Sequence, residues 1–529
     1  MADVREMRIF SAEQIVVQQE LPNILKNYSK EVIRNNPEDI IKFSREYFEQ
    51  LLKEDGFFDD HLDKLQVTGK SLLFRKGEKI TNVYEIGDMY SDSYYRKARV
   101  GIHKKTGIER AILQKSKSDY PSTEAFLKKM EVLGSYDHPN IVRYLEVYED
   151  EHYYFLVCEC LKGNDIIDQV WRQGRHTEEY GATILKQILN GVLYIHSKGV
   201  AHNLLAPINI LHVNPGSPEI KIIDMDEAGN QPIKDLDKFL RYGEYRGCYI
   251  APETIKGQWN IKCDEFAVGI IMYYLLVGDV PFYGWDYKET LKLITEYKFD
   301  QTSYNFTSLS IEARDLMLRL MAYKPEDRIS AQDALKHPWF NKAQKGELRS
   351  KDLGDALNSI KKFHAGGKLK QAVQGYFTQN LLSQQELNDL AALFQQFDKN
   401  SNGVLSRDEL IDAYRTTRGV NFSEKEIDEM IRRVDADGSG DINYSEFINV
   451  AVSNEKLLSD EKLEKAFRVF DRDGNNEVTI QEIKELLDAC RMIDEKMVQR
   501  AIKDIDRIGK GKLTFVEFKR FIQSLFQGQ

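Results

Sequence analysis

The C-terminal third of this 529-residue chain contains one kind of segment repeated four times. Consecutive copies begin 37, 36 and 35 residues apart, and their first residues are Asp398, Asp435, Asp471 and Asp506. The twelfth position of every copy is a glutamate, namely Glu409, Glu446, Glu482 and Glu517. The eighth position is always apolar, namely Leu405, Ile442, Val478 and Leu513. A fixed period of this length indicates repeated structural units that pack on their neighbours.

The oxygen-bearing residues within each copy follow the ligand spacing of an EF-hand calcium loop, which uses positions 1, 3, 5, 9 and 12 and a main-chain carbonyl at position 7. The first loop offers Asp398, Asn400, Asn402, Val404, Ser406 and Glu409. The second offers Asp435, Asp437, Ser439, Asp441, Asn443 and Glu446. The third offers Asp471, Asp473, Asn475, Glu477, Thr479 and Glu482. We therefore expect an all-α, calmodulin-like module over residues 385–529 that binds three Ca²⁺ ions.

The sixth position of such a loop needs a left-handed backbone, which glycine and asparagine adopt most easily. Gly403, Gly440 and Asn476 stand there in the first three loops. The fourth loop places Ile508 and Lys510 where side-chain oxygens belong. Because a lysine repels the cation, we expect the fourth loop not to bind Ca²⁺.

Composition excludes several classes of protein. A net charge of −10 argues against nucleic-acid binding. The longest apolar run, residues 266–277, is too short to span a bilayer and predicts a buried helix instead of membrane insertion. The start of the chain lacks the apolar core of a signal peptide, and five scattered cysteines suit a reducing compartment, so we expect a cytoplasmic protein.

The N-terminal region, residues 12–55, predicts two short helices. One carries Leu21, Leu25 and Tyr28 at helical spacing, and the second carries Phe43 and Phe48. Asn36 and Pro37 between them form a typical helix start. Two short helices bury too little apolar surface alone, so we expect this unit to form a homodimer or heterodimer.

The middle of the chain, residues 81–340, resembles a protein kinase, and we expect the bilobal α+β fold of that family. The residues that carry the resemblance are His138, Pro139, Asn140, Ile141, His202, Asn209, Asp224, Ala251, Pro252, Glu253, Asp264, Asp327 and Arg328. The resemblance implies that Glu253 and Arg328 form a buried pair. Residues 56–80 are predicted to be a linker.

The same resemblance shows that the groups for phosphoryl transfer are replaced. The base position is Leu204, the strand lysine position is Leu113, and its glutamate partner is Lys129. One glycine, Gly87, remains of the phosphate-binding loop. Without a base, a lysine and a phosphate loop we expect no phosphotransferase activity, and ATP and Mg²⁺ binding is doubtful.

Two features keep an alternative open. Asn209 and Asp224 remain as ligands for residual Mg²⁺-nucleotide, although they can equally serve as hydrogen-bonding scaffold. Lys115 lies two residues beyond Leu113 and so on the same face of the strand. The alternative is therefore an active calcium-dependent serine/threonine protein kinase with a displaced catalytic lysine.

Residues 341–384 form a junction whose apolar positions predict an amphipathic helix interrupted at Gly366 and Gly367. These positions are Leu353, Leu357, Ile360, Phe363, Leu369, Val373 and Phe377. A kinase domain, such a junction and four EF-hands in this order resemble the calcium-dependent protein kinases of plants and protists. That resemblance implies that Ca²⁺ loading moves the EF module through the junction.

The N-terminal region resembles the dimerisation/docking domain of type II regulatory subunits of cyclic-AMP-dependent kinase, in the variant of ropporin and radial-spoke proteins. The resemblance runs through residues 17–34 and includes Pro37 and Tyr47. It implies a dimer that binds an amphipathic anchoring helix in a groove. The groove residues would be Ile15, Val17, Leu21 and Leu25. The alternative is an ordinary helical hairpin that packs on the kinase-like domain.

Together these patterns predict a multidomain, calcium-responsive and catalytically inactive scaffold. We expect it to dock through its N-terminal dimer on an anchoring helix in the axoneme of a cilium or flagellum.

Overall fold

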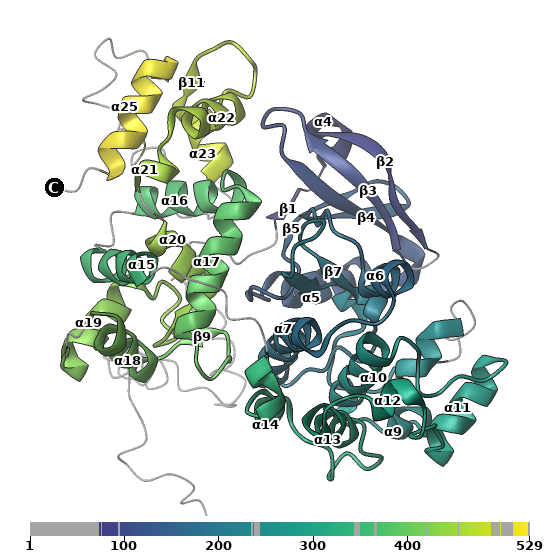
Figure 1. The fold of residues 1–529 in the computed structure, drawn as a ribbon. Coiled ribbons are helices and arrows are strands. Elements are labelled where there is room, and N and C mark those ends of the chain that lie inside the picture. The colour runs from purple at the N-terminus through teal and green to yellow at the C-terminus, as the bar shows by residue number, and fades with distance from the viewer. Residues whose placement is uncertain are drawn as a thin grey trace, which may run out of the picture. The chain divides into compact units, whose positions relative to one another are not determined.

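The computed structural model describes residues 73–526 except 76, 94–95, 234–235, 237–243, 343–349, 364–367, 419–420, 453, 488–497 and 499–510. The predicted docking unit and its groove residues therefore lie outside the described part of the chain. Figure 1 shows a sheet-rich lobe, a helical lobe and a further, mainly helical part of the chain that contains short strands in its loops. Among the described helices, none is long and apolar enough to cross a membrane.

The sheet-rich lobe consists of six strands in the order β1-β5-β6-β4-β3-β2. The strands are β1 Leu73–Phe74, β2 Tyr84–Ser93, β3 Arg96–His103, β4 Glu109–Ser116, β5 Tyr144–Glu149 and β6 Tyr153–Glu159. Two helices, α4 Ile80–Val83 and α5 Thr123–Gly134, accompany them. The predicted linker was wrong at its C-terminal end, because Leu73 and Phe74 pair in parallel with β5. Main-chain hydrogen bonds to an exposed sheet edge do not depend on side-chain pattern, so the composition of this segment did not reveal the strand.

The helical lobe is built around α10, Cys263–Val277, in which every residue except Tyr274 is buried. The predicted buried helix over residues 266–277 is thereby confirmed. The other α-helices and strands described in this lobe are α6 Ile166–Gln173, α7 Glu178–Ser197, β7 Ile210–His212, β8 Ile220–Ile222, α9 Pro252–Ile255, α11 Tyr287–Glu296, α12 Tyr304–Thr307, α13 Ile311–Leu320 and α14 Ala331–Leu335. Helices α7 and α13 pack on α10, and α14 packs on α7.

The structural residues of the kinase fold keep their roles. The Arg328 guanidinium is fully buried and makes two hydrogen bonds to the Glu253 carboxylate, at 2.8 and 3.1 Å. The Asp264 carboxylate accepts main-chain hydrogen bonds from His202 and Asn203. The predicted Glu253–Arg328 pair is confirmed, and the loop that would hold the catalytic base is fixed to α10.

The junction forms two helices, α15 Ser350–Lys362 and α16 Lys368–Asn380. Their apolar side chains belong to the core of the EF module and not to the core of the kinase-like domain. Leu357, Ile360, Leu369, Val373 and Phe377 are buried in that core, and Leu353 and Phe363 are half-buried against it. The predicted amphipathic positions are therefore confirmed, with the EF module as the partner of the apolar face.

The helices that the structure describes in the EF module are α17 Gln384–Phe397, α18 Arg407–Arg418, α19 Glu424–Val434, α20 Tyr444–Ala451, α21 Asn454–Leu457, α22 Asp460–Phe470, α23 Ile480–Leu487 and α25 Phe515–Phe526. Four short strands, β9 Val404–Leu405, β10 Ile442–Asn443, β11 Val478–Thr479 and β12 Lys512–Leu513, lie within the calcium loops. Leu405 pairs with Ile442 and Val478 pairs with Leu513 in antiparallel register. The apolar eighth positions thus join the loops in pairs.

Candidate functional site

The second and third calcium loops each gather three carboxylates. The ligand oxygens of Asp435, Asp437 and Glu446 lie within 4.8 Å of one another, and so do those of Asp471, Asp473 and Glu482. Ca²⁺ prefers several carboxylate and carbonyl oxygens at short range, so these residues fit the ion. The structure brings together the carboxylates that the spacing predicted.

Main-chain N–H groups hold these carboxylates in place. In the third loop Asp471 accepts hydrogen bonds from the amides of Asn475 and Asn476, at 3.0 and 2.9 Å. Glu482 accepts from the amides of Arg472 and Thr479, both at 2.8 Å. The ligands are therefore oriented before an ion arrives, which lowers the ordering cost of binding.

The first loop has two carboxylates, Asp398 and Glu409, and completes its set with Asn400, Asn402 and Ser406. Asp398 accepts from the amides of Asn402 and Gly403, at 3.1 and 2.9 Å. Burial raises the pKa of Asp398 to about 7, and the neighbouring Glu409 adds to this shift. A proton therefore competes with Ca²⁺ for Asp398 near neutral pH.

The sixth loop positions have the backbone that the sequence predicted. Their φ angles are +81° at Gly403, +89° at Gly440 and +63° at Asn476. The left-handed conformation of Asn476 explains why the third loop needs no glycine there. In the fourth loop Ile508 and Lys510 lie outside the described residues, so their effect on Ca²⁺ binding stays a prediction.

The kinase-like cleft contains a largely buried lysine, Lys115, on β4. Leu113 pairs with Leu156 on β6 and packs against the core, as its apolar side chain requires. Two residues further along β4, the Lys115 ammonium forms an ion pair with the carboxylate of Asp226. Both side chains are largely buried, with exposed fractions of 13% and 16%. Strand periodicity indicated the direction of Lys115, but its partner was not predicted.

The charges around this pair reinforce it. Burial by itself lowers the pKa of Lys115, but Asp226 and Asp224 outweigh burial and raise it. Burial would raise the pKa of Asp226, but Lys115 and Lys129 together hold it below its usual value. Lys129, at the position of the family's glutamate on α5, thus acts on Asp226 as a second cation. In this cleft the positive charges of Lys115 and Lys129 therefore offset the negative charge of Asp226, where the family has a lysine–glutamate pair.

Asn209 and Asp224 are the two residues that the sequence left as candidate ligands for Mg²⁺-nucleotide. The side-chain amide of Asn209 donates a hydrogen bond to the main-chain carbonyl of Leu204 at 3.0 Å, so Asn209 stabilises the loop that contains Leu204. Asp224 has a left-handed backbone, with φ of +62°. Leu204 has no group that accepts a proton. The side chains of the phosphate-loop residues 88–95 lie outside the described part of the chain.

The calcium loops also contact the kinase-like domain, which the sequence did not predict. The Asp137 carboxylate accepts hydrogen bonds from the amide and the hydroxyl of Ser445, both at 2.8 Å. Arg143 donates to the same hydroxyl at 3.1 Å. Gly403 lies so close to the Tyr194 ring that an added Cβ would be 2.5 Å from it.

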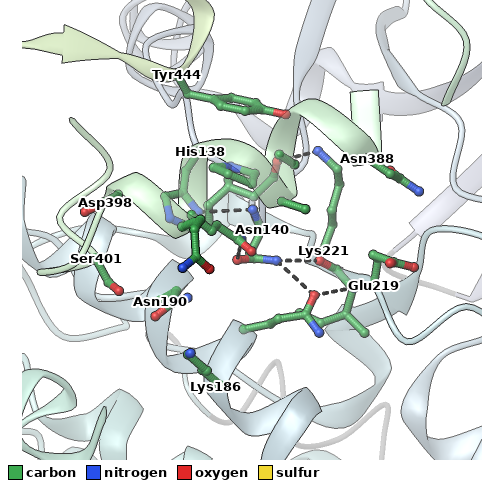
Figure 2. A pocket seen from close by; sticks show the side chains of 18 of the residues that line it. His138, Asn140, Lys186, Asn190, Glu219, Lys221, Asn388, Asp398, Ser401 and Tyr444 are labelled. Carbon is green, nitrogen blue, oxygen red and sulfur yellow. Dashed lines mark hydrogen bonds between the residues drawn. The ribbon is translucent and has the colours of Figure 1, made fainter. Parts of the chain in front are cut away.

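Between these contacts lies a cavity of about 1080 Å³. Figure 2 shows His138, Asn140 and Lys221 of the kinase-like domain around it, together with Asn388 and Tyr444 of the EF module. The Gln395 amide donates to the Asn140 side-chain carbonyl at 2.9 Å across this boundary. His138 and Asn140 were read from the sequence as marks of the kinase fold, and here they also contribute to a surface for the EF module.

Comparison with known proteins agrees with this architecture. Residues 95–340 match the protein kinase domain, residues 387–452 and 460–523 match the EF-hand domain pair, and residues 3–55 match the Ropporin N-terminal domain. Calcium-dependent protein kinase 4 of Plasmodium berghei (strain Anka) is 34% identical over 399 residues, which cover 72% of this chain and 75% of that relative. Calcium-dependent protein kinase 5 of Plasmodium falciparum (isolate 3D7) is 31% identical over 432 residues, which cover 81% and 75%. This chain, with its kinase domain, EF-hand pairs and Ropporin-like N-terminus, therefore belongs to the calcium-dependent protein kinase family.

Proposed function

We propose that this protein is a calcium-responsive, catalytically inactive kinase-fold scaffold that docks on an amphipathic anchoring helix in the ciliary or flagellar axoneme. The observation that carries the inactive reading is the cleft, where Lys115 is paired with Asp226 and Leu204 stands at the base position. The base and the strand lysine of the family are thus both replaced by leucine, at Leu204 and Leu113.

Loss of a general base alone typically slows a reaction by about 10²–10⁴-fold. Leu204 and Leu113 remove the base and the phosphate lysine together. Lys115 pairs with Asp226 in the cleft, but this ion pair supplies neither the missing base nor the missing phosphate loop. These costs support a scaffold that has kept the kinase fold for its shape.

We expect no transfer of phosphate to the chain itself or to a generic substrate, with or without Ca²⁺. The measurement is incorporation of labelled phosphate from Mg·ATP, together with the thermal shift caused by Mg·ATP. Leu204→Asp alone should not restore activity, because the lysine remains displaced. Calcium-stimulated autophosphorylation that is lost in both Asp224→Ala and Lys115→Met would overturn the proposal in favour of an active kinase with a displaced lysine.

Calcium responsiveness is supported by three loops with full ligand sets and by a junction that packs in the EF core. We propose three Ca²⁺ ions per chain. In sensor EF-hands, binding opens an apolar groove between paired helices. Because α15 and α16 supply apolar residues to this core, a change in the groove acts directly on the segment that leads to the kinase-like domain.

Calorimetric titration of the full chain with Ca²⁺ is expected to give three sites. Glu446→Gln should remove one of them, because a bidentate carboxylate becomes a neutral amide. Glu517→Gln in the fourth loop is the matched control and should leave the number unchanged. Four sites in the parent chain, or fewer than two, would contradict the stoichiometry.

Docking is supported by the match of residues 3–55 to the Ropporin N-terminal domain. We propose that this segment dimerises and that Ile15, Val17, Leu21 and Leu25 line the groove for the anchoring helix. We propose a place in the axoneme because the N-terminal region resembles that of ropporin and radial-spoke proteins of cilia and flagella. Partner recognition therefore belongs to the N-terminus, and calcium sensing to the other end of the chain.

Val17→Glu is expected to abolish binding of an amphipathic anchoring helix, because it places a charge on the apolar groove, while the dimer remains. Phe48→Ala should instead weaken the dimer. Binding of a labelled anchoring helix to the full chain and sedimentation equilibrium separate the two effects. A monomeric chain that binds no such helix would show that residues 12–55 are an ordinary hairpin.

A further inference from the structure

The turn between β3 and β4 of the kinase-like domain touches the third calcium loop. The Lys105 ammonium donates a hydrogen bond to the main-chain carbonyl of Asp471, the first residue of that loop, at 2.6 Å. Ile108, at the end of the same turn, packs against the apolar core of the EF module. One polar and one apolar contact therefore join the turn to the module.

The position of Lys105 is set by its own turn. The amide of His103 donates to the carbonyl of Ile108 at 2.9 Å, and the amide of Gly107 donates back to the carbonyl of His103 at 2.8 Å. The His103 ring accepts from the amide of Thr106 at 3.2 Å. Gly107 has a φ of +67°, which closes the turn. A turn held in this way presents Lys105 to the loop from a fixed direction.

The charge of this lysine is directed at the calcium ligands. Burial lowers the pKa of Lys105, and Arg472 lowers it further, whereas the carboxylates of Asp471, Glu482 and Asp473 attract the ammonium and act in the opposite direction. Among the described residues, no carboxylate forms an ion pair with Lys105, so its charge is not neutralised by a partner in its own domain. The ammonium lies beside three acids that would together surround a divalent cation.

The second loop provides an internal comparison. Its carboxylates are gathered in the same way, but its contact with the kinase-like domain runs through Ser445 to Asp137 and Arg143, which bring charges of both signs. The third loop faces a lysine. Two loops with equivalent ligand sets therefore meet different charges.

We propose that Lys105 of the kinase-like domain is an affinity-determining residue of the third calcium site. Its ammonium is a tethered cation that lowers the affinity of this loop for Ca²⁺. Binding effects between two sites are reciprocal, so Ca²⁺ in the third loop weakens the contact of the turn by the same factor. The inference rests on the proposed binding of Ca²⁺ to the third loop and names the residue that couples it to the kinase-like domain.

The test isolates the third loop in the full chain. Glu409→Gln and Glu446→Gln together disable the first two loops, and Ca²⁺ alone is then titrated by calorimetry. In this background Lys105→Gln is expected to raise the affinity about threefold to tenfold, the effect of removing one charge near a divalent ion at a partly solvated site. Because the effect is electrostatic, the gain should shrink as salt concentration rises.

Two variants serve as controls. Lys104→Gln removes the neighbouring lysine of the same turn, whose ammonium binds the Thr81 carbonyl within its own lobe, and should leave the affinity unchanged. Lys105→Arg keeps the charge and should also keep the lower affinity. Thermal unfolding in the presence of a chelator checks that each variant is folded.

Hydrogen exchange at residues 103–108 gives a second readout. In the chain that carries Glu409→Gln and Glu446→Gln, Ca²⁺ should speed hydrogen exchange at these residues. Adding Lys105→Gln should remove most of this response. Unchanged or weaker Ca²⁺ affinity in Lys105→Gln would overturn the inference. A background chain that binds no Ca²⁺ at all would instead show that the third loop is not a site, which is a failure of the proposed function.

Discussion

Arg328→Leu is expected to destabilise the kinase-like domain by about 3–5 kcal/mol, the usual loss when one member of a buried ion pair is removed. The Arg328 side chain is fully buried and binds both oxygens of Glu253. It also donates to the main-chain carbonyls of Lys262, Ala322 and Tyr323. The substitution therefore leaves a buried carboxylate and three carbonyls without this donor.

Calorimetry of the full chain measures this loss, since the transition that shifts with Ca²⁺ belongs to the EF module and the other can be assigned to the kinase-like domain. Arg319→Leu is the matched control, because its pair with Asp315 is exposed and such pairs contribute about 0–1 kcal/mol. Glu253→Leu combined with Arg328→Leu should cost less than Arg328→Leu alone. A single variant no less stable than the control would show that the pair is not the anchor of this lobe.

Phe377→Ala is expected to destabilise the EF module by about 3–5 kcal/mol, the range for removing a buried phenyl ring. Phe377 is fully buried in α16, within the core that the junction shares with the calcium-binding helices. Hydrogen bonds from Gln374 and Thr378 to Asn449 fix the same face of α16 on α20. Loss of the ring should therefore also reduce the change in shape that we expect Ca²⁺ to cause.

Phe363→Ala is the matched control, since Phe363 follows the end of α15 and is only half-buried against the same core. Its loss should be about 1–2 kcal/mol, in line with the smaller apolar area that it buries. Calorimetry gives the stability, and small-angle scattering with and without Ca²⁺ gives the change in shape. Identical scattering in the two states of the parent chain would make the module a static brace.

The calcium loops were predictable residue by residue because their chemistry is local. Twelve consecutive residues supply every ligand, and the left-handed positions Gly403, Gly440 and Asn476 can be read from residue type alone. The junction was also predictable, because helical spacing determines which side chains share a face. The sequence pattern did not reveal that this face is buried in the EF module.

For the cleft, the sequence predicted which kinase residues are replaced but not which contacts take their place. Leu113, Leu204 and Lys129 indicated which kinase groups are replaced, because each falls at a functional position of a kinase motif that the sequence resembles. The new pair could not be derived from spacing, since Lys115 and Asp226 are 111 residues apart and meet only when β4 packs over the loop after β8. An ion pair of this kind leaves no periodic signal in either segment.

The sequence by itself predicted the calcium ligands and the apolar face of the junction, because neighbouring residues and regular spacing encode both. The replaced catalytic groups were predicted from the resemblance to kinase motifs. Only the tertiary structure decided that Asp137 meets Ser445 and that Lys105 meets Asp471. Those contacts join residues 308 and 366 positions apart. The packing of whole domains selects which residues form these contacts. A polar side chain on a surface turn can bond to many partners, and only the fold brings one of them within hydrogen-bond distance.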